Sequence, residues 1–295
     1  MSSFEYYAPE TMSELLDILS ANQENSKILA GGTDVTVHLR EGKIAPQCVI
    51  ALKKVSDLKG ISLQGTNIVI GPMTTFTELV ESPIIRENAW LLAQAAVSVG
   101  SPQIRNQGTV GGNIANASPA GDSLPALMAL DAVLKIISKR GEREMPLENF
   151  YLGISKNKLE KDEIVAGISF PVLEKGTGSA FVKLGRRNAL AISRISAAAI
   201  IGYDHAENLI TSCRISVGSV AQNPFRVRSA EQMMLSCPLN ADNRNKCITA
   251  AFEEMAATLG KRASAVYKRK AGPEIVRRAL DEAIRMAGGS WEAVI

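Results

Sequence analysis

Cysteine and histidine, which build many protein metal centres, are scarce in this sequence. It has four cysteines and two histidines among 295 residues. The cysteines form no CxxC pair, and His38 and His205 stand far apart, outside any HExxH motif. We therefore expect no iron–sulfur cluster, no zinc site and no catalytic residue in this chain. Free thiols in a reducing cytoplasm are the simpler interpretation of Cys48, Cys213, Cys237 and Cys247.

Long apolar runs and a secretory start are also missing. The longest apolar run, residues 195–203, is interrupted by Ser196 and Gly202, and it falls short of the roughly 18 residues of a membrane span. Residues 1–7 lack the basic and then apolar segments of a signal peptide. We therefore expect a cytoplasmic protein without a membrane span.

Neither sign of charge dominates the chain. The 33 basic and 30 acidic residues leave a net charge of +3, whereas a nucleic-acid-binding protein is expected to have a dominant basic face. Nucleic acid is therefore not an expected partner. Hydrophobic residues make up 46% of the chain, which is ordinary for a globular protein, and the length is typical of about two domains.

The polar, glycine-rich segment 174–178 is the clearest domain boundary. We predict a first domain at 1–174 and a second at 175–295. The first would contain subdomains of about 1–55 and 56–174.

Periodicity predicts the elements of each part. The first subdomain is expected to alternate short strands and helices, and the second to contain a helix over 84–99 and a long polar stretch at 100–122. The second domain is predicted to have three strands and then helices, the last over 263–286 and interrupted at Pro273.

A double-glycine turn follows an early strand. Glycines let a backbone approach a ligand closely, and successive N–H groups form a nest for anions. The turn also opens a predicted helix, whose dipole favours a pyrophosphate. Alternatively, the glycines only make a tight turn that Thr33 or Asp34 caps. The spacing is not GxGxxG, so a Rossmann nicotinamide site is not supported. The candidate residues are Lys27, Ile28, Leu29, Ala30, Gly31, Gly32, Thr33 and Asp34.

A second double-glycine turn lies within residues 109–123. Here side chains that donate and accept hydrogen bonds flank glycines whose backbone is open to close approach. This combination suits a ligand with phosphates and a polyol chain. A simple connection would need only one or two such side chains. The candidates are Thr109, Val110, Gly111, Gly112, Asn113, Ser118 and Asp122.

The two turns together resemble a known family. AGGTD followed by TVGGN and SPAGD, with QIRN just ahead of the second turn, is similar to the FAD-binding subunit of molybdenum hydroxylases, which include xanthine, nicotinate and carbon monoxide dehydrogenases. The resemblance covers essentially the whole chain. It implies an α+β fold: an FAD-binding domain of two α/β subdomains, of the PCMH or vanillyl-alcohol-oxidase-like type, then a three-stranded antiparallel sheet with a helical bundle.

The resemblance also implies roles for single residues. Residues 27–34 would cradle the pyrophosphate, and Thr109 to Asn113 would hold it from the other subdomain. Asp122 matches an acid near the ribityl or phosphate region, and Ile164 matches an apolar contact on the adenine side. Lys183 matches a lysine near the flavin ring, where a cation would stabilise an anionic reduced flavin; alternatively it faces water at a strand end. The fused xanthine dehydrogenases have an aromatic residue in place of Val99, a departure that affects stacking on the flavin.

The implied function is electron transfer. Substrate, a purine or other N-heterocycle, would be oxidised on a molybdopterin-binding large subunit, and electrons would pass through [2Fe–2S] clusters of a small subunit to the FAD here. NAD⁺ or another acceptor would then be reduced. Two alternatives remain: a self-sufficient FAD-dependent reductase or oxidase, for which no clear proton donor is present, and a flavin-free scaffold subunit.

A basic stretch would be a solvated face, or would dock NAD phosphates or a partner subunit; it comprises Lys183, Arg186, Arg187 and Arg194.

Overall fold

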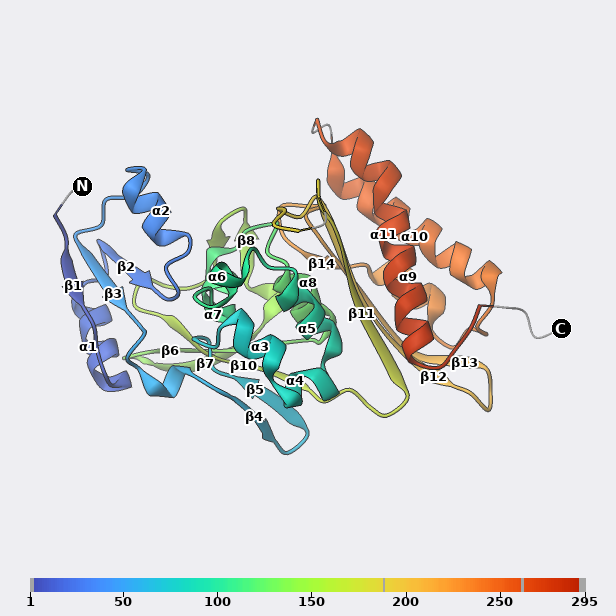
Figure 1. The fold of residues 1–295 in the computed structure, drawn as a ribbon, viewed down its shortest axis with the longest axis horizontal. Helices are drawn as coiled ribbons and strands as arrows, with labels where there is room; N and C mark the ends of the chain where they lie inside the picture. Colours follow the sequence, from blue (N-terminus) through green and yellow to red (C-terminus); the bar gives the residue numbers. More distant parts are fainter. Residues whose placement is uncertain (1–2, 188, 261–262, 292–295) are drawn as a thin grey trace.

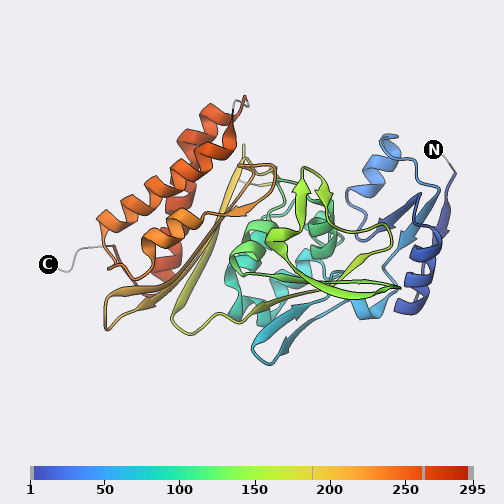
Figure 2. The same ribbon diagram turned by 180° about the vertical axis from the view of Figure 1, so that it is seen from behind.

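The computed structural model describes residues 3–187, 189–260 and 263–291, so the outermost ends of the two predicted domains lie outside the described residues. The molecule is elongated, with the first strands at one end and the C-terminal helices at the other (Figure 1). Seen from behind, the same three layers follow one another along the long axis (Figure 2).

The N-terminal layer is a small parallel sheet of order β1-β3-β2. Helix α1 buries Leu15 and Leu19, which join Ile50 in a compact hydrophobic cluster. Helix α2 differs, because none of its residues is buried. The elements are β1 (Glu5–Tyr7), α1 (Met12–Ala21), β2 (Ser26–Leu29), α2 (Val35–Arg40) and β3 (Cys48–Ala51).

The middle layer contains an antiparallel sheet of order β4-β5-β10-β6-β7. Its central strand is the last of the five along the chain. Ile68, Leu134 and Ile168 belong to the largest hydrophobic cluster, beneath the helices of this layer. The strands are β4 (Ile61–Gln64), β5 (Asn67–Ile70), β6 (Val133–Ser138), β7 (Gly141–Pro146) and β10 (Ile164–Pro171).

The helices of this layer are shorter than predicted. A single helix over 84–99 is wrong, because α4 ends at Asn88 and α5 begins at Trp90. Ala89 has φ −151° and ψ 51°, outside the helical region, while its side chain is fully buried. The polar stretch 100–122 also contains helical turns, since Ser101 caps α6 and Thr109 caps α7. The helices are α3 (Phe76–Glu81), α4 (Pro83–Asn88), α5 (Trp90–Val97), α6 (Pro102–Arg105), α7 (Val110–Asn116) and α8 (Ser123–Ala129).

The C-terminal layer has one strand more than expected. The sheet has order β11-β12-β13-β14, and the additional β14 is only two residues long. A strand this short has no periodicity to detect. The sheet packs on one side against α5 and α8 and on the other against α11 (Figure 1). Its strands are β11 (Thr177–Leu184), β12 (Ile195–Asp204), β13 (Leu209–Gly218) and β14 (Phe225–Arg226).

The predicted interruption at Pro273 is also wrong, because α11 continues through it. Proline removes one hydrogen bond from the helix. On either side of it, however, Gly272, Ile275, Val276, Ala279 and Leu280 are buried, and this packing outweighs the lost bond. The helices of this layer are α9 (Arg228–Met234), α10 (Ala241–Leu259) and α11 (Ala265–Met286).

Candidate functional site

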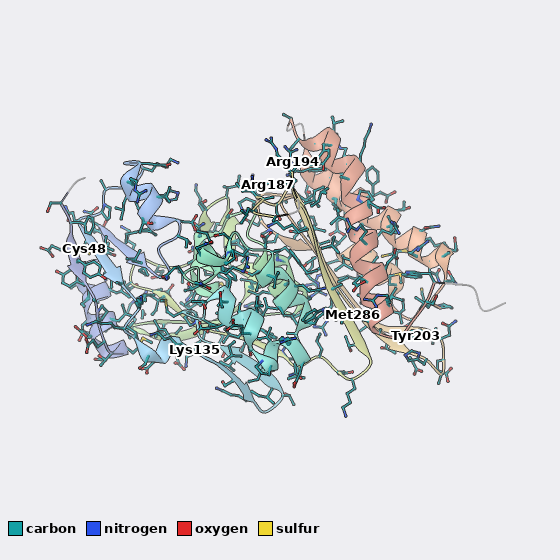
Figure 3. The ribbon with its side chains drawn as sticks, viewed as in Figure 1. Cys48, Lys135, Arg187, Arg194, Tyr203 and Met286 are labelled. Carbon is teal, nitrogen blue, oxygen red and sulfur yellow. The ribbon has the colours of Figure 1, made fainter. Side chains whose placement is uncertain are left out.

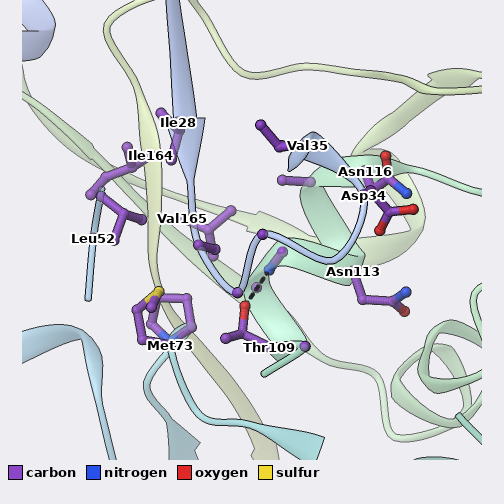
Figure 4. Close-up of a pocket in the computed structure, with 18 of the residues that line it drawn as sticks. Ile28, Asp34, Val35, Leu52, Met73, Thr109, Asn113, Asn116, Ile164 and Val165 are labelled. Carbon is purple, nitrogen blue, oxygen red and sulfur yellow. Dashed lines mark hydrogen bonds between the residues drawn. The ribbon is translucent and has the colours of Figure 1, made fainter. Parts of the chain in front are cut away.

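A cavity of ≈ 370 Å³ lies where the N-terminal and middle layers meet. One wall is formed by residues 26–35 and a second by residues 104–116. The segment leading into β10, residues 157–165, closes a third side, and Leu52, Met73 and Phe76 add apolar surface (Figure 4). The volume lies within the range of small-molecule and cofactor pockets.

Gly31 and Gly111 are required by the packing of the protein against itself. A Cβ atom on Gly31 would lie 1.8 Å from the carbonyl oxygen of Gln107. A Cβ atom on Gly111 would lie 2.3 Å from the Cβ atom of Pro72. These glycines therefore allow the two turns to approach the neighbouring backbone, whether or not a ligand is present.

Gly32 and Gly112 have different surroundings. Gly32 has φ +77°, the left-handed region that favours glycine, and a Cβ atom there would meet no backbone atom within 4 Å. A Cβ atom on Gly112 would meet only the Thr109 hydroxyl at 2.9 Å and the Ala30 Cβ at 3.4 Å. Both glycines line the cavity, so an added side chain would occupy cavity space rather than the packed interior.

The first turn has free hydrogen-bond donors. Among the described residues, no hydrogen-bond partner is recorded for the backbone N–H groups of Gly31, Gly32 and Thr33. Three consecutive free amides beside a cavity form the kind of concave donor group that holds an anion. The first turn therefore has the geometry expected of a pyrophosphate cradle.

The amides of the second turn are already used. Val110 donates to the Thr74 carbonyl, Gly111 to the Pro72 carbonyl, and Gly112 to the Thr109 hydroxyl oxygen at 3.1 Å (Figure 4). The Asn113 side-chain oxygen accepts from Ser123 at 2.8 Å. The donors left facing the cavity are the Thr109 hydroxyl and the Asn113 amide nitrogen. The two turns thus differ in what they offer a ligand.

Most of the residues proposed from the sequence meet at this cavity. Its lining includes Lys27, Ile28, Ala30, Gly31, Gly32, Thr33, Asp34, Val99, Thr109, Gly111, Gly112, Asn113 and Ile164. Leu29 is half-buried in β2, and Val110 lies in the middle hydrophobic cluster. Ser118, Asp122 and Lys183 lie outside the cavity lining.

Asp122 and Lys183 form an ion pair between the middle and C-terminal layers. The Lys183 Nζ lies 2.5 Å from Asp122 Oδ2 and donates to the Ser98 carbonyl at 2.9 Å. The Ser193 hydroxyl donates to the other carboxylate oxygen of Asp122 at 2.5 Å. Burial raises the pKa of Asp122, and the nearby Lys183 cation opposes this shift without cancelling it. Lys183 therefore does not face water, and Ser98 places the pair one residue from Val99 of the cavity.

The rest of the basic stretch is held largely by its own surroundings. Arg187 donates twice to the Leu190 carbonyl, at 3.2 and 2.7 Å. The Arg194 guanidinium lies 5.5 Å from the centre of the Tyr267 ring, a cation–π distance. Both arginines lie at the edge of the molecule beside the start of α11 (Figure 3). Neither lines the cavity.

Sequence reasoning missed the third wall of the cavity. Besides Ile164, it is formed by Asn157, Leu159, Glu160, Lys161, Glu163 and Val165. Arg143 donates two hydrogen bonds to Glu163, at 2.8 and 2.7 Å, and this contact holds the pKa of Glu163 below its usual value. No motif marks this segment, because its charges resemble those of an ordinary exposed hairpin.

Other kinds of centre are not found in the part of the chain that the structure describes. No group of three or more potential metal ligands is present there. No described helix is long and apolar enough to cross a membrane. The cavity between the two turns is therefore the leading candidate site.

A cavity between two glycine turns, with free amides on one side, defines a binding domain for an extended, phosphate-bearing cofactor. Residues 2–173 match the family model described as the FAD binding domain in molybdopterin dehydrogenase. Residues 179–283 match the carbon monoxide dehydrogenase flavoprotein C-terminal domain. The chain belongs to this family of FAD-binding dehydrogenase subunits, so it is an FAD-dependent oxidoreductase subunit of the xanthine dehydrogenase-like kind.

Similar proteins cover nearly the full length. The nicotinate dehydrogenase FAD-subunit of Eubacterium barkeri is 34% identical over 92% of this chain and 92% of its own length. The xanthine dehydrogenase FAD-binding subunit of Escherichia coli is 33% identical over 97% of this chain and 98% of its own. A carbon monoxide dehydrogenase structure from Hydrogenophaga pseudoflava superposes with a TM-score of 0.90 and 29% identity, covering 96% of this chain and 98% of that one.

Proposed function

We propose that this chain is the electron-transfer subunit of a multi-subunit molybdenum hydroxylase. Electrons would arrive from [2Fe–2S] clusters on a small partner chain and leave to NAD⁺ or another acceptor. The substrate, a purine or other N-heterocycle, would be oxidised on a molybdopterin-binding large subunit. The observation that carries this proposal is the cavity between two glycine turns, which has free backbone amides on one wall and hydroxyl and amide side chains on the other.

We assign the pyrophosphate to the first turn. The free amides of Gly31, Gly32 and Thr33 would donate to it, and Thr109 and Asn113 would approach from the opposite wall through their side chains. This arrangement neutralises anionic oxygens without a metal ion, because backbone dipoles supply the positive potential.

We assign the adenine end to the wall that contains Ile164, and the flavin end to the region of Val99. There Asp122 and Lys183 would act from behind the cavity surface, through Ser98. When bound, FAD supplies the redox chemistry, and the protein orients and tunes it.

Three of the charged groups of the cavity argue against a self-sufficient reductase. Such an enzyme needs a proton donor directed at its substrate. Glu163 is held by Arg143, Glu160 by Arg140 and Lys161 by Glu24. These ion pairs occupy three of the five charged side chains that line the cavity; for the other two, Lys27 and Asp34, no ion pair is recorded among the described residues.

We also propose two domains, 1–174 and 175–295, with subdomains of about 1–55 and 56–174 in the first. One hydrophobic cluster is drawn entirely from residues after 179 and supports the second domain, while Phe181, Ala198 and Ile200 join the cluster of the middle layer across the proposed boundary. The cavity would then lie between the subdomains, so that the cofactor is clasped by both.

The first test is a visible absorption spectrum of the purified chain, with mass identification of the released cofactor. We expect FAD, and the partner subunits should co-purify from the native source. FMN would contradict the assignment of the pyrophosphate site. A colourless protein that fails to take up added FAD would favour the scaffold alternative.

A further inference from the structure

Helix α2 and the segment that follows it lie on the outside of the fold. None of residues 33–47 is buried. The apolar side chains of this segment, among them Val37 and Leu39, belong to none of the hydrophobic clusters and pack against none. Val37 is 44% exposed. Val35, Leu39 and Ile44 are half-buried, so the hydrophobic contacts of the segment are shallower than those that hold the rest of the layer together.

Hydrogen bonds do not anchor the segment either. Every hydrogen bond and ion pair recorded for residues 33–46 has its partner within 32–46. Examples are Thr36 to the Gly32 carbonyl and Lys43 to the His38 carbonyl. The next recorded hydrogen bond to another part of the layer is that of the Gln47 amide, which donates to the Asn25 carbonyl. Both ribbon views show α2 at the outer edge of its layer, joined by its ends to β2 and β3 (Figures 1 and 2).

Such a helix is not stable by itself. Isolated helices shorter than about 12–15 residues are marginal in water, and α2 has six residues. Each end has a glycine in the left-handed region, Gly32 at φ +77° and Gly42 at φ +69°. Regions with few buried contacts open locally at low free energy. The segment thus has a flexible point at each end and little that holds it closed.

The near end of the segment forms part of the cavity wall. Gly32, Thr33, Asp34 and Val35 all line the cavity, and no hydrogen-bond partner is recorded among the described residues for the amides of Gly32 and Thr33. A ligand held by these residues would therefore fix the end from which α2 begins. Order in the segment and occupancy of the cavity are coupled through this shared stretch of backbone.

We propose that residues 33–46 form a flap, which is loose while the cavity is empty and closes when a dinucleotide occupies it. The flap controls how the cofactor enters and how long it stays. This inference depends on the proposed FAD site, and it adds that cofactor retention is set partly by a segment whose recorded hydrogen bonds and ion pair stay within residues 32–46.

Hydrogen–deuterium exchange of the whole chain, with and without FAD, tests the flap directly. We expect the amides of residues 36–42 to exchange fast without FAD and to slow at least about tenfold with it, since closure must shift a local opening equilibrium. Helix α1, in the same layer but with Leu15 and Leu19 buried, is the internal control and should be protected in both states. Protection of residues 36–42 without FAD would overturn the flap.

A pair of matched glycine variants provides an independent test. Gly42→Val and Gly65→Val both place a β-branched residue at a left-handed position, φ +69° and +60°, with open space around the new side chain. Gly65 lies in the β4–β5 hairpin, which is part of the folded sheet. We expect Gly65→Val to lower the melting temperature and leave FAD affinity unchanged. Gly42→Val should leave the melting temperature of the FAD-free chain unchanged and raise the dissociation constant roughly tenfold, because only the closed flap is strained.

The outcomes separate the flap from the proposed function. If FAD binds normally to the wild type but neither the exchange nor the Gly42→Val affinity behaves as expected, the flap is wrong and the FAD site stands. If Gly42→Val lowers the melting temperature as much as Gly65→Val, the segment is a fixed part of the fold. A well-folded wild type that binds no FAD overturns both proposals.

Discussion

The four glycines of the cavity are glycines for two different reasons. Gly31 and Gly111 allow backbone to meet backbone, whereas Gly32 and Gly112 leave space in the cavity. A sequence motif cannot separate the two kinds of glycine, because each turn shows only two adjacent glycines, one of each kind. The separation matters for mutagenesis, since one pair should report on folding and the other on ligand binding.

We predict that Gly112→Val abolishes FAD retention while the chain still folds, and that Gly32→Val does the same with added backbone strain at φ +77°. The new side chains would fill space where the cofactor must approach the backbone. Flavin absorbance per folded chain measures the effect, with circular dichroism as the check on folding. Gly111→Val is the matched control and should fail to fold, because its Cβ atom would lie 2.7 Å from the Pro72 carbonyl oxygen. A folded Gly112→Val protein with full flavin content would disprove the assignment.

We expect Asp122→Ala to lower the free energy of unfolding by about 3–5 kcal/mol, because it leaves the Lys183 cation uncompensated in a largely buried position. The Lys183 side chain is only 14% exposed. Retention of FAD should weaken less than in Gly112→Val. The double variant Asp122→Ala/Lys183→Met should recover much of the loss in urea denaturation. Equal losses in the single and double variants would show that the ion pair is not the cause.

Glu163 should make stability depend on pH. Its pKa is lowered from 4.5, chiefly by the hydrogen bonds from Arg143, so its contribution is present above pH 4.5 and lost as the pH falls through the lowered value. We expect Glu163→Gln to be less stable than wild type by about 1 kcal/mol at pH 7, since Arg143 is partly exposed. The difference should shrink below pH 4.5. A difference that is constant with pH would contradict this.

At the scale of the helices and strands, sequence reasoning succeeded where periodicity or a turn was strong. It located β2, α2, β3 and the long strands of the C-terminal sheet. It failed at Ala89, where a buried, apolar stretch continues through a break in the helix, and at Pro273, where buried neighbours outweigh one lost hydrogen bond. Both failures have one cause. Tertiary packing determined the backbone conformation at these positions and overrode the local helix propensity of the sequence.

The candidate site was predictable to a similar extent. Both glycine turns carry recognisable patterns, and the structure brings them to one cavity. The wall around Glu163 was not predictable, because it forms only when the segment before β10 folds back across the turns. Contacts between segments that are far apart in the sequence produce no local sequence pattern that could be recognised.

The contact between β11 and α11 depends on one glycine. A Cβ atom on Gly178 would lie 1.8 Å from the Ala283 carbonyl oxygen and 2.4 Å from the Ala287 nitrogen. We expect Gly178→Ala to lower the free energy of unfolding by about 3 kcal/mol, since helix and sheet must separate. Gly167→Ala, whose Cβ would meet only the Lys135 Cβ at 3.6 Å, should change it much less. Similar values for the two variants in urea denaturation would refute this.

At the scale of the whole molecule, a buried arginine joins the last two layers. Arg226 in β14 donates to Glu231 of α9 and to Asp131, which follows α8. Its side chain is 5% exposed and that of Glu231 is 8% exposed. Glu231 also accepts from the Ile215 amide. Two strands, one helix and the middle layer therefore meet at a single charged group.

We predict that Arg226→Met lowers the free energy of unfolding by about 3–5 kcal/mol, because it removes the buried cation that balances Glu231. The C-terminal layer should then melt before the rest, giving two transitions in calorimetry. Arg285→Met is the matched control: it breaks an ion pair with Glu282 whose side chains are 70% and 35% exposed, and should lower the free energy of unfolding by about 0–1 kcal/mol. A single unshifted transition for Arg226→Met would rule out this role.

The position of β10 at the centre of the five-stranded sheet has a consequence for biosynthesis. β5 and β6 pair with β10 and not with each other, so the β4–β5 and β6–β7 hairpins leave the ribosome with facing edges unpaired. At about 5–20 residues per second, the edge of β6 waits about 1–5 seconds for residues 164–171, and the edge of β5 waits about 5–20 seconds. Unpaired edges invite association with other chains. The third wall of the cavity arrives in the same segment, so the nascent protein is most prone to aggregate just before it first becomes able to hold its cofactor.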